Sequence, residues 1–161
     1  MYTQLQLVEI FHIEFLRYLA ADMPPGLWAL KGGVNLRLFF KSIRYSEDMD
    51  LDVKGMPVES VKKRVMRILT SPSFRENLKT FGIAAIADII RAKQTAITQR
   101  FKVHLVTSSG EDHFTKVEFS RRGFQGEPVA EPVPAVGLRP YGMAPLVVWH
   151  YPAAISAAQK I

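Results

Sequence analysis

Cysteine is absent from the 161-residue chain. The sequence therefore excludes a disulfide framework, a thiolate zinc site and a cysteine nucleophile, and it is compatible with a reducing compartment. A signal peptide is not predicted either, because no basic residues precede the apolar N-terminal residues and Glu9, Glu14 and Asp22 interrupt them. We therefore expect a cytoplasmic protein.

Long apolar runs are also scarce. One stretch, residues 140–159, contains His150 as its only readily charged side chain, but three prolines interrupt it. Proline breaks a helix, and lipid cannot satisfy the backbone groups that such a break exposes. We therefore expect no contact with a membrane.

The composition is that of a folded, basic domain. Hydrophobic residues make up 48% of the chain and charged residues 22%, which excludes a disordered or low-complexity protein. The length predicts a single domain over residues 1–161. Lys and Arg total 21 against 15 Asp and Glu, a net charge of +6 that favours a polyanionic partner such as nucleic acid or nucleotide phosphate.

The first half of the chain alternates helical and extended patterns. Apolar residues at helical spacing predict helices over 4–21, 34–41, 58–69 and 74–81. A short apolar run at 27–30 and an alternating segment at 46–53 predict strands. Gly32 and Gly33 lie between the first of these strands and the helix at 34–41, which indicates a strand, a glycine turn and a helix.

The second half favours β-structure. The pattern becomes that of strands after Gly82, and alternation over 97–105 and 114–121 around a polar turn predicts a hairpin. From residue 128 onward, frequent prolines predict an extended connection that leads to a helix beginning at residue 153. We expect the chain to be cut or naturally short within that helix.

Asp48 and Asp50 are the sharpest chemical feature. Residues i and i+2 of a strand point to the same face, roughly 6.6 Å apart, so both carboxylates converge while Met49 and Leu51 enter the core. Mg²⁺ prefers one or two carboxylates together with substrate phosphates. Two such ions about 3.5–4 Å apart promote phosphoryl or nucleotidyl transfer. The alternative is a solvated strand face that happens to carry alternating acids.

Gly32 and Gly33 could admit a phosphate. Glycines before a helix let backbone N–H groups approach an anion closely, and the helix N-terminus adds partial positive charge. A plain turn would use the same residues. The sequence contains neither the P-loop pattern nor the dinucleotide-binding glycine pattern.

Two segments together resemble a known family. Residues 30–38 read Leu-Lys-Gly-Gly-Val-Asn-Leu-Arg-Leu, and residues 44–51 read Arg-Tyr-Ser-Glu-Asp-Met-Asp-Leu. This resembles the signature of the AbiEii/AbiGii-type nucleotidyltransferase toxins, which belong to the DNA polymerase β-like nucleotidyltransferase superfamily. The family pattern is Lys-Gly-Gly followed by Leu-Arg and then Arg-x-Ser-x-Asp-x-Asp. The resemblance is strong from residue 28 to residue 53.

The resemblance implies a set of metal ligands. Asp48 and Asp50 would be the paired ligands for Mg²⁺ or Mn²⁺, and the superfamily takes a third carboxylate from a later antiparallel strand. Glu118 is the candidate, because its parity separates it from its apolar neighbours. Asp52 continues the acidic face, and we interpret it as a charge at the strand end.

The resemblance also implies a site for a nucleoside triphosphate. Its candidate residues are Lys31, Gly32, Gly33, Arg37, Ser46 and Lys160. Arg37 and Arg44 could serve the phosphates or brace the site. Lys160 falls where related toxins place a lysine near the start of a helix, and we expect the family's further C-terminal helices to be missing.

A basic cluster surrounds the predicted hairpin. Its members are Arg91, Lys93, Arg100, Lys102, Lys116, Arg121 and Arg122. They could form an ordinary solvated face or, beside a metal site, seat an RNA acceptor through its phosphates.

We therefore expect an α/β nucleotidyltransferase fold, with a short mixed sheet and helices packed on one face. The expected activity is Mg²⁺-dependent transfer of a nucleoside monophosphate from an NTP to an acceptor, with tRNA a plausible acceptor. The resemblance implies the toxin of a toxin–antitoxin or abortive-infection pair, with a cognate antitoxin. The alternatives are a non-catalytic remnant that binds NTP or RNA, and a nucleotidyltransferase antitoxin that modifies protein.

Overall fold

A seven-stranded mixed sheet forms the body of the protein in the computed structural model, which describes residues 1–152. Its strands are β1 (Trp28–Lys31), β2 (Met49–Val53), β3 (Ile83–Gln94), β4 (Thr98–Thr107), β5 (Asp112–Ser120), β6 (Val129–Pro132) and β7 (Val147–His150). Their order across the sheet is β3-β4-β5-β2-β1-β7-β6. The β2–β5 and β1–β7 pairs are parallel and the other pairs are antiparallel.

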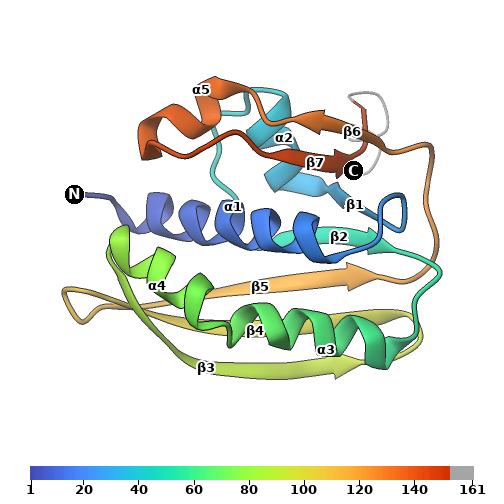
Figure 1. Cartoon of the computed structure of the whole chain (residues 1–161), viewed down its shortest axis with the longest axis horizontal. Helices are drawn as coiled ribbons and strands as arrows, with labels where there is room; N and C mark the ends of the chain where they lie inside the picture. The colour runs from blue at the N-terminus through green and yellow to red at the C-terminus, as the bar shows by residue number, and fades with distance from the viewer. Residues whose placement is uncertain (153–161) are drawn as a thin grey trace.

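Three helices lie along one face of this sheet: α1 (Gln4–Asp22), α3 (Val58–Leu69) and α4 (Pro72–Thr80), as Figure 1 shows. The shorter α2 (Gly32–Phe39) follows β1, and α5 (Ala135–Leu138) with the 3₁₀ turn Arg139–Tyr141 precedes β7. The expected α/β class with a mixed sheet and helices on one face is confirmed, although the sheet is larger than the short one we expected. Within residues 1–152, no helix has the length and apolar character needed to cross a membrane.

Local sequence accounts for where the long helices begin. Thr3 caps α1 through a reciprocal capping box with Gln6, so two N–H groups at the helix start are satisfied. Ser71 caps α4 by accepting from the Phe74 amide, and Pro72 occupies the first turn, where its missing N–H costs nothing.

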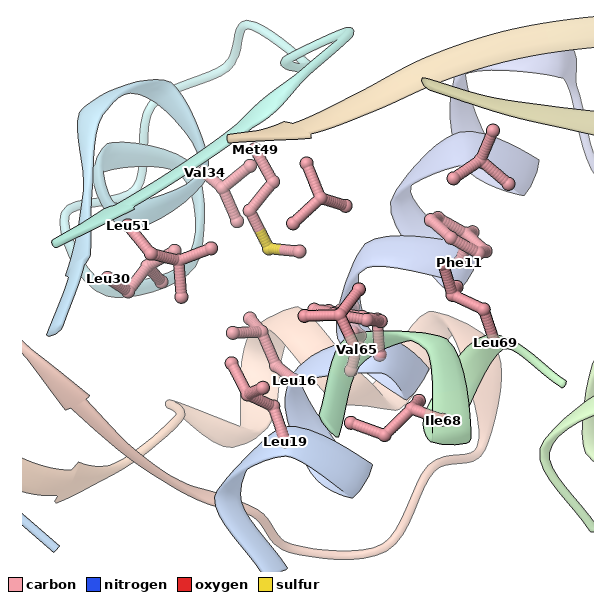
Figure 2. Close-up of a cluster of buried hydrophobic side chains, with 14 of the residues drawn as sticks. Phe11, Leu16, Leu19, Leu30, Val34, Met49, Leu51, Val65, Ile68 and Leu69 are labelled. Carbon is pink, nitrogen blue, oxygen red and sulfur yellow. The ribbon is translucent and has the colours of Figure 1, made fainter. Parts of the chain in front are cut away.

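The hydrophobic core lies between the sheet and the helices. In Figure 2, Phe11 and Leu16 of α1 and Val65 of α3 gather toward Leu30 and Leu51 of the central strands. All five side chains are completely buried. Burying each one fully contributes roughly 1.5–3 kcal/mol, so this cluster holds β2 and its acidic residues in place.

The C-terminal third is more ordered than we expected. In place of an extended connection, it forms β6, α5 and β7, and β7 pairs with β1 in parallel, one strand in from the edge of the sheet that β6 forms. The start of a helix predicted at residue 153 lies outside the described residues. The strand β3 had no separate prediction, and bulges that interrupt its pairing with β4 explain why its residues do not alternate cleanly.

Candidate active site

The carboxylates of β2 and β5 lie side by side on the face of the sheet that the core does not occupy. Met49 and Leu51 are fully buried, so the residue between them, Asp50, points to the opposite face. The parallel register of β2 and β5 pairs Asp50 directly with Glu118. Neighbouring strands are about 4.7–4.9 Å apart, which brings these two acids together from segments far apart in sequence.

Asp48 lies one residue before β2 and is held by Lys116 of β5. Its Oδ1 accepts a hydrogen bond of 2.9 Å from the Lys116 amide, and its Oδ2 lies 3.7 Å from Lys116 Nζ. About two-fifths of the Asp48 side chain is exposed to solvent. The structure therefore fixes one carboxylate oxygen and leaves the other within reach of a ligand.

Glu118 is engaged by a neighbouring strand. Arg100 of β4 is its register partner, and Arg100 Nε donates to Glu118 Oε1 over 2.6 Å. Both side chains are partly exposed. The ion pair engages Oε1 of Glu118, and within residues 1–152 no hydrogen bond holds Oε2, so this second oxygen could ligate a metal ion while Arg100 stays in place.

The surroundings of Asp50 disfavour its charged form. Burial raises the pKa of Asp50, and the nearby carboxylates of Glu118 and Asp48 raise it further, whereas Lys31 and Lys116 act in the opposite direction. A cation between Asp48 and Asp50 would relieve this repulsion. Excess negative charge on hard oxygen donors is the chemistry that Mg²⁺ requires.

The carboxylates do not yet form a closed ligand set. Within the part of the chain that the structure describes, no group of three acidic, histidine or cysteine side chains is arranged to hold a metal ion. Asp48 and Asp50 fit a cation that completes its coordination with substrate oxygens, because Mg²⁺ usually retains such ligands.

The double glycine forms the first turn of α2 and not a separate turn before it. Gly32 has a left-handed φ of +70°, and a Cβ there would lie 3.3 Å from Asp50 Oδ2. A Cβ on Gly33 would lie 2.9 Å from Ser46 Oγ, closer than real Cβ atoms come. Ser46 Oγ in turn donates to the Asp48 carbonyl over 2.6 Å. The glycines therefore admit Ser46 and Asp50 against the start of α2.

A pocket of about 540 Å³ opens at this point. Its lining includes Gly33, Ser46, Asp48, Asp50 and Arg44. No side chain caps the N-terminus of α2, so its first N–H groups have no acceptor from Lys31. The pocket thus combines a helix N-terminus, a hydroxyl, an arginine and two carboxylates.

Arg37 braces the site and does not line this pocket. Arg37 Nε donates to Glu9 over 2.7 Å, its Nη1 donates to the Ser42 carbonyl, and its guanidinium lies 3.9 Å from the centre of the Tyr45 ring. The hydrogen bond with Glu9 raises the pKa of Arg37 further above its already high value. Arg37 therefore ties α2 to α1 and to the loop that carries Ser46.

Lys31 and Asp52 form a buried ion pair, and the expectation that Asp52 is a charge at the strand end is wrong. Asp52 is only 1% exposed. Its Oδ1 lies 2.7 Å from Lys31 Nζ without hydrogen-bond alignment, and its Oδ2 accepts from the Tyr151 hydroxyl. Tyr151 follows β7, so a residue 99 positions away covers Asp52.

The structure places Gly32, Gly33, Ser46, Asp48, Asp50 and Glu118 close together. It places Lys31 next to these residues but in contact with Asp52, and Lys160 lies outside the described residues. The roles of Lys116 and Arg100 as partners of Asp48 and Glu118 were not predicted individually. The sequence did indicate that both basic residues lie on the same face of the hairpin as Glu118, because each alternates with buried apolar residues along its strand.

Comparisons with known proteins agree with this geometry. A family model described as nucleotidyl transferase AbiEii toxin, type IV TA system, matches residues 15–161. A search of the curated proteins gave no match.

Two solved structures share the fold. JHP933 from Helicobacter pylori aligns with a TM-score of 0.68 and 22% identity over 99% of this chain and 56% of its own. MenT4, a nucleotidyltransferase toxin from Mycobacterium tuberculosis, aligns with a TM-score of 0.68 and 16% identity over 97% of this chain and 51% of its own. The chain thus spans about half the length of these proteins.

The family match covers most of the chain and includes both halves of the site, the glycine start of α2 and the paired aspartates Asp48 and Asp50 at the start of β2. The chain belongs to the AbiEii family of nucleotidyl transferase toxins.

Proposed function

We propose that this chain transfers a nucleoside monophosphate from an NTP to an RNA acceptor, with tRNA as the leading candidate. In this reaction a hydroxyl oxygen of the acceptor bonds to the α-phosphorus of the NTP. The bond between that phosphorus and the bridging oxygen of the β-phosphate breaks, and pyrophosphate leaves. The hydroxyl proton passes to a carboxylate of the site or to water.

One observation carries the proposal: Asp48 and Asp50 line the same pocket as the start of α2. The pocket also contains Ser46, whose hydroxyl lies against Gly33. A triphosphate requires close backbone N–H groups and positive charge, and the carboxylates must lie beside it for transfer to occur.

On the nucleotide side, the uncapped N-terminus of α2 faces the triphosphate. Gly32 and Gly33 leave room for it, and Arg44 supplies an exposed positive charge at the pocket wall. Lys31 holds Asp52 and lowers the negative charge beside Asp50. Lys160 remains a candidate triphosphate ligand from the family pattern alone.

Mg²⁺ or Mn²⁺ would be held by Asp48 and Asp50, with Glu118 as a third ligand. When bound, the ion neutralises the phosphates and lowers the pKa of a coordinated hydroxyl. In the protein alone, three carboxylates lie close together on this face, and the raised pKa of Asp50 reflects its burial and their mutual repulsion.

We further propose that the protein acts as a cytoplasmic toxin that a cognate antitoxin neutralises, in abortive infection or a related response. The description of the family as a type IV toxin–antitoxin component supports this role. The net charge of +6 supports an RNA acceptor in preference to a neutral or basic one.

The direct test incubates the purified chain with Mg²⁺, total tRNA and each α-³²P-labelled NTP in turn. A longer product of the gene is tested in parallel where the reading frame continues past residue 161. Label on tRNA that disappears with Asp48→Ala supports the proposal and identifies the nucleotide.

Other outcomes separate the alternatives. Label on a protein and none on RNA would retain the chemistry but indicate a protein-modifying enzyme. If neither form transfers label while the chain binds NTP or RNA, the protein is a binding remnant and the proposed activity is wrong.

A further inference from the structure

An exposed aromatic pair lies on the open face of the sheet, two rows of side chains away from Glu118. Phe114 of β5 has 69% of its side chain exposed, which is unusual for phenylalanine within a strand. Its ring stacks on His104 of β4, with centroids 4.5 Å apart and planes at 23°. His104 Nε2 also lies 2.7 Å from Asp112 Oδ1, so the apolar surface that faces solvent is the ring of Phe114.

The strand register arranges the open face in rows. His104 pairs with Phe114, Lys102 pairs with Lys116, and Arg100 pairs with Glu118, while Glu118 continues the last row to Asp50 of β2. Successive rows are roughly 6.6–6.8 Å apart, because alternate residues of a strand share a face. Along these strands, the aromatic pair therefore comes first, the lysine pair next, and the row that contains the carboxylates of Glu118 and Asp50 last.

The pairing of Lys102 with Lys116 is unfavourable in the absence of a bound ligand. Like charges directly opposite each other on neighbouring strands destabilise their pairing. Lys116 approaches Asp48, but across residues 1–152 no ion-pair partner is found for the exposed Lys102. An anion bound between the two ammonium groups would remove this cost.

A pocket of about 470 Å³ connects these features. It is lined by Phe114, His104, Lys102 and Lys116, and it reaches Asp48 of the transfer site. Two further acids, Glu47 and Asp88, lie in its lining, and Asp88 accepts from the Ile89 amide.

We infer that this open face is the acceptor site, and that it takes the single-stranded end of an RNA. A base stacks on Phe114, the adjoining phosphate lies between Lys102 and Lys116, and the terminal hydroxyl points toward Asp48 and Asp50. Every base offers a π-face to an aromatic side chain, and lysines recognise the phosphate. A peptide would satisfy neither the like-charged lysine pair nor the flat ring as fully.

This inference rests on the proposed nucleotidyl transfer, so its test includes a measurement that does not require transfer. Binding of a fluorescein-labelled single-stranded RNA with a free 3′ hydroxyl is measured by anisotropy, beside the KM values for RNA and NTP in the transfer assay. Phe114→Leu keeps an apolar cross-strand neighbour for His104 but removes the ring, and Phe114→Trp keeps a stacking surface.

We expect Phe114→Leu to weaken RNA binding about tenfold and to raise the KM for RNA while the KM for NTP is unchanged. Phe114→Trp restores binding. Lys102→Gln weakens binding and lowers the slope of log K against log salt by about 0.7. Lys63→Gln, an equal charge change on the helical side of the sheet, has no effect.

The inference is overturned if Phe114→Leu and Lys102→Gln bind RNA as the unchanged protein does, or if label goes to a protein and not to RNA. Loss of thermal stability in Phe114→Leu that matches its loss of binding would also overturn it, because the ring would then serve the sheet. RNA binding that depends on Phe114 without any transfer would support the surface and contradict the proposed activity.

Discussion

The ammonium of Lys31 lies 2.7 Å from the carboxylate of Asp52, and this pair joins the end of β1, just before the glycines of α2, to β2, the strand that carries Asp50. Both side chains are largely withdrawn from water. The hydroxyl of Tyr151, the residue after β7, donates to the same carboxylate, so residues from β1, from β2 and from the end of β7 meet at Asp52. The pair fixes the positions of Gly32, which follows Lys31, and of Asp50, which lies two residues before Asp52 and is the register partner of Lys31.

Removing the Asp52 charge should destabilise the fold strongly. Asp52→Asn leaves the Lys31 ammonium without its partner, and breaking a buried pair in this way costs about 3–5 kcal/mol. Urea unfolding measures the loss. Glu76→Gln breaks the exposed Glu76–Lys79 pair and serves as the matched control, with an expected loss of at most about 1 kcal/mol. Equal losses in the two variants would contradict the buried role of Asp52.

Removing the charge of Asp50 should stabilise the fold near neutral pH. The raised pKa of Asp50 means that the folded protein holds this proton to a higher pH than the unfolded chain does. Stability contributed by that proton is present below the ordinary pKa of Asp and is lost as pH rises through the raised value.

Asp50→Asn should therefore melt at a higher temperature than the unchanged protein at pH 7 without Mg²⁺, and the difference should shrink at pH 4. A gain of about 1 kcal/mol raises the melting temperature of a domain this size by about 2–4 °C. Thermal scans at both values of pH check this. If the difference in melting temperature between Asp50→Asn and the unchanged protein were the same at pH 7 and pH 4, the neighbours of Asp50 would not disfavour its charged form.

Adding a methyl group to Gly33 should disturb nucleotide binding. The new Cβ would lie 2.9 Å from Ser46 Oγ and would displace the hydroxyl that holds the Asp48 carbonyl. We expect Gly33→Ala to weaken NTP binding at least tenfold in a calorimetric titration. Gly137→Ala is the control, because its Cβ would meet only ordinary contacts of 3.8 and 3.9 Å. Unchanged affinity in Gly33→Ala would contradict the assignment of this pocket to the nucleotide.

A buried chain of hydrogen bonds from His12 through Thr115 holds the backbone of Glu47, the residue before Asp48. Thr115 Oγ1 donates to the Glu47 carbonyl over 2.7 Å, so it must accept from His12 Nε2, which lies 2.8 Å away. Burial lowers the pKa of His12 to about 3, which keeps the ring neutral. The imidazole signals of His12 should therefore not titrate between pH 8 and pH 5 by NMR.

Thr115→Val keeps the shape of the side chain but leaves the His12 N–H and the Glu47 carbonyl unpaired. We expect a loss of about 1–3 kcal/mol in the free energy of unfolding. A His12 signal that titrates near its ordinary value, or a Thr115→Val variant as stable as the unchanged protein, would show that this chain of hydrogen bonds does not form.

The sequence alone predicted those features that depend on local periodicity. The two-residue period of a strand placed Asp48 and Asp50 on one side and Met49 in the core, and the hairpin of β4 and β5 follows from the same rule. The family pattern around Gly33 and Ser46 located the second half of the site.

The remaining features depend on contacts between distant segments. Asp52 looks like a surface acid until Tyr151 of the C-terminal third covers it, and proline-rich sequence concealed the strand that precedes Tyr151. Arg100 was one of several basic residues, and only the register of β4 with β5 assigns it to Glu118. Strand character after Gly82 was predicted, but the bulges of β3 interrupt its alternation, so its bounds were not.

The central claim is that Asp48 and Asp50 carry nucleotidyl transfer, and pyrophosphate release with acceptor RNA and labelled NTP tests it most directly. The account predicts that Asp48→Ala and Asp50→Ala each lower the rate at least a thousandfold, a loss of about 4 kcal/mol of transition-state stabilisation, while both variants remain folded. Glu59→Ala, an equal charge change on the exposed face of α3, should retain the full rate. Transfer, or growth arrest on expression, that survives both aspartate substitutions would contradict the account.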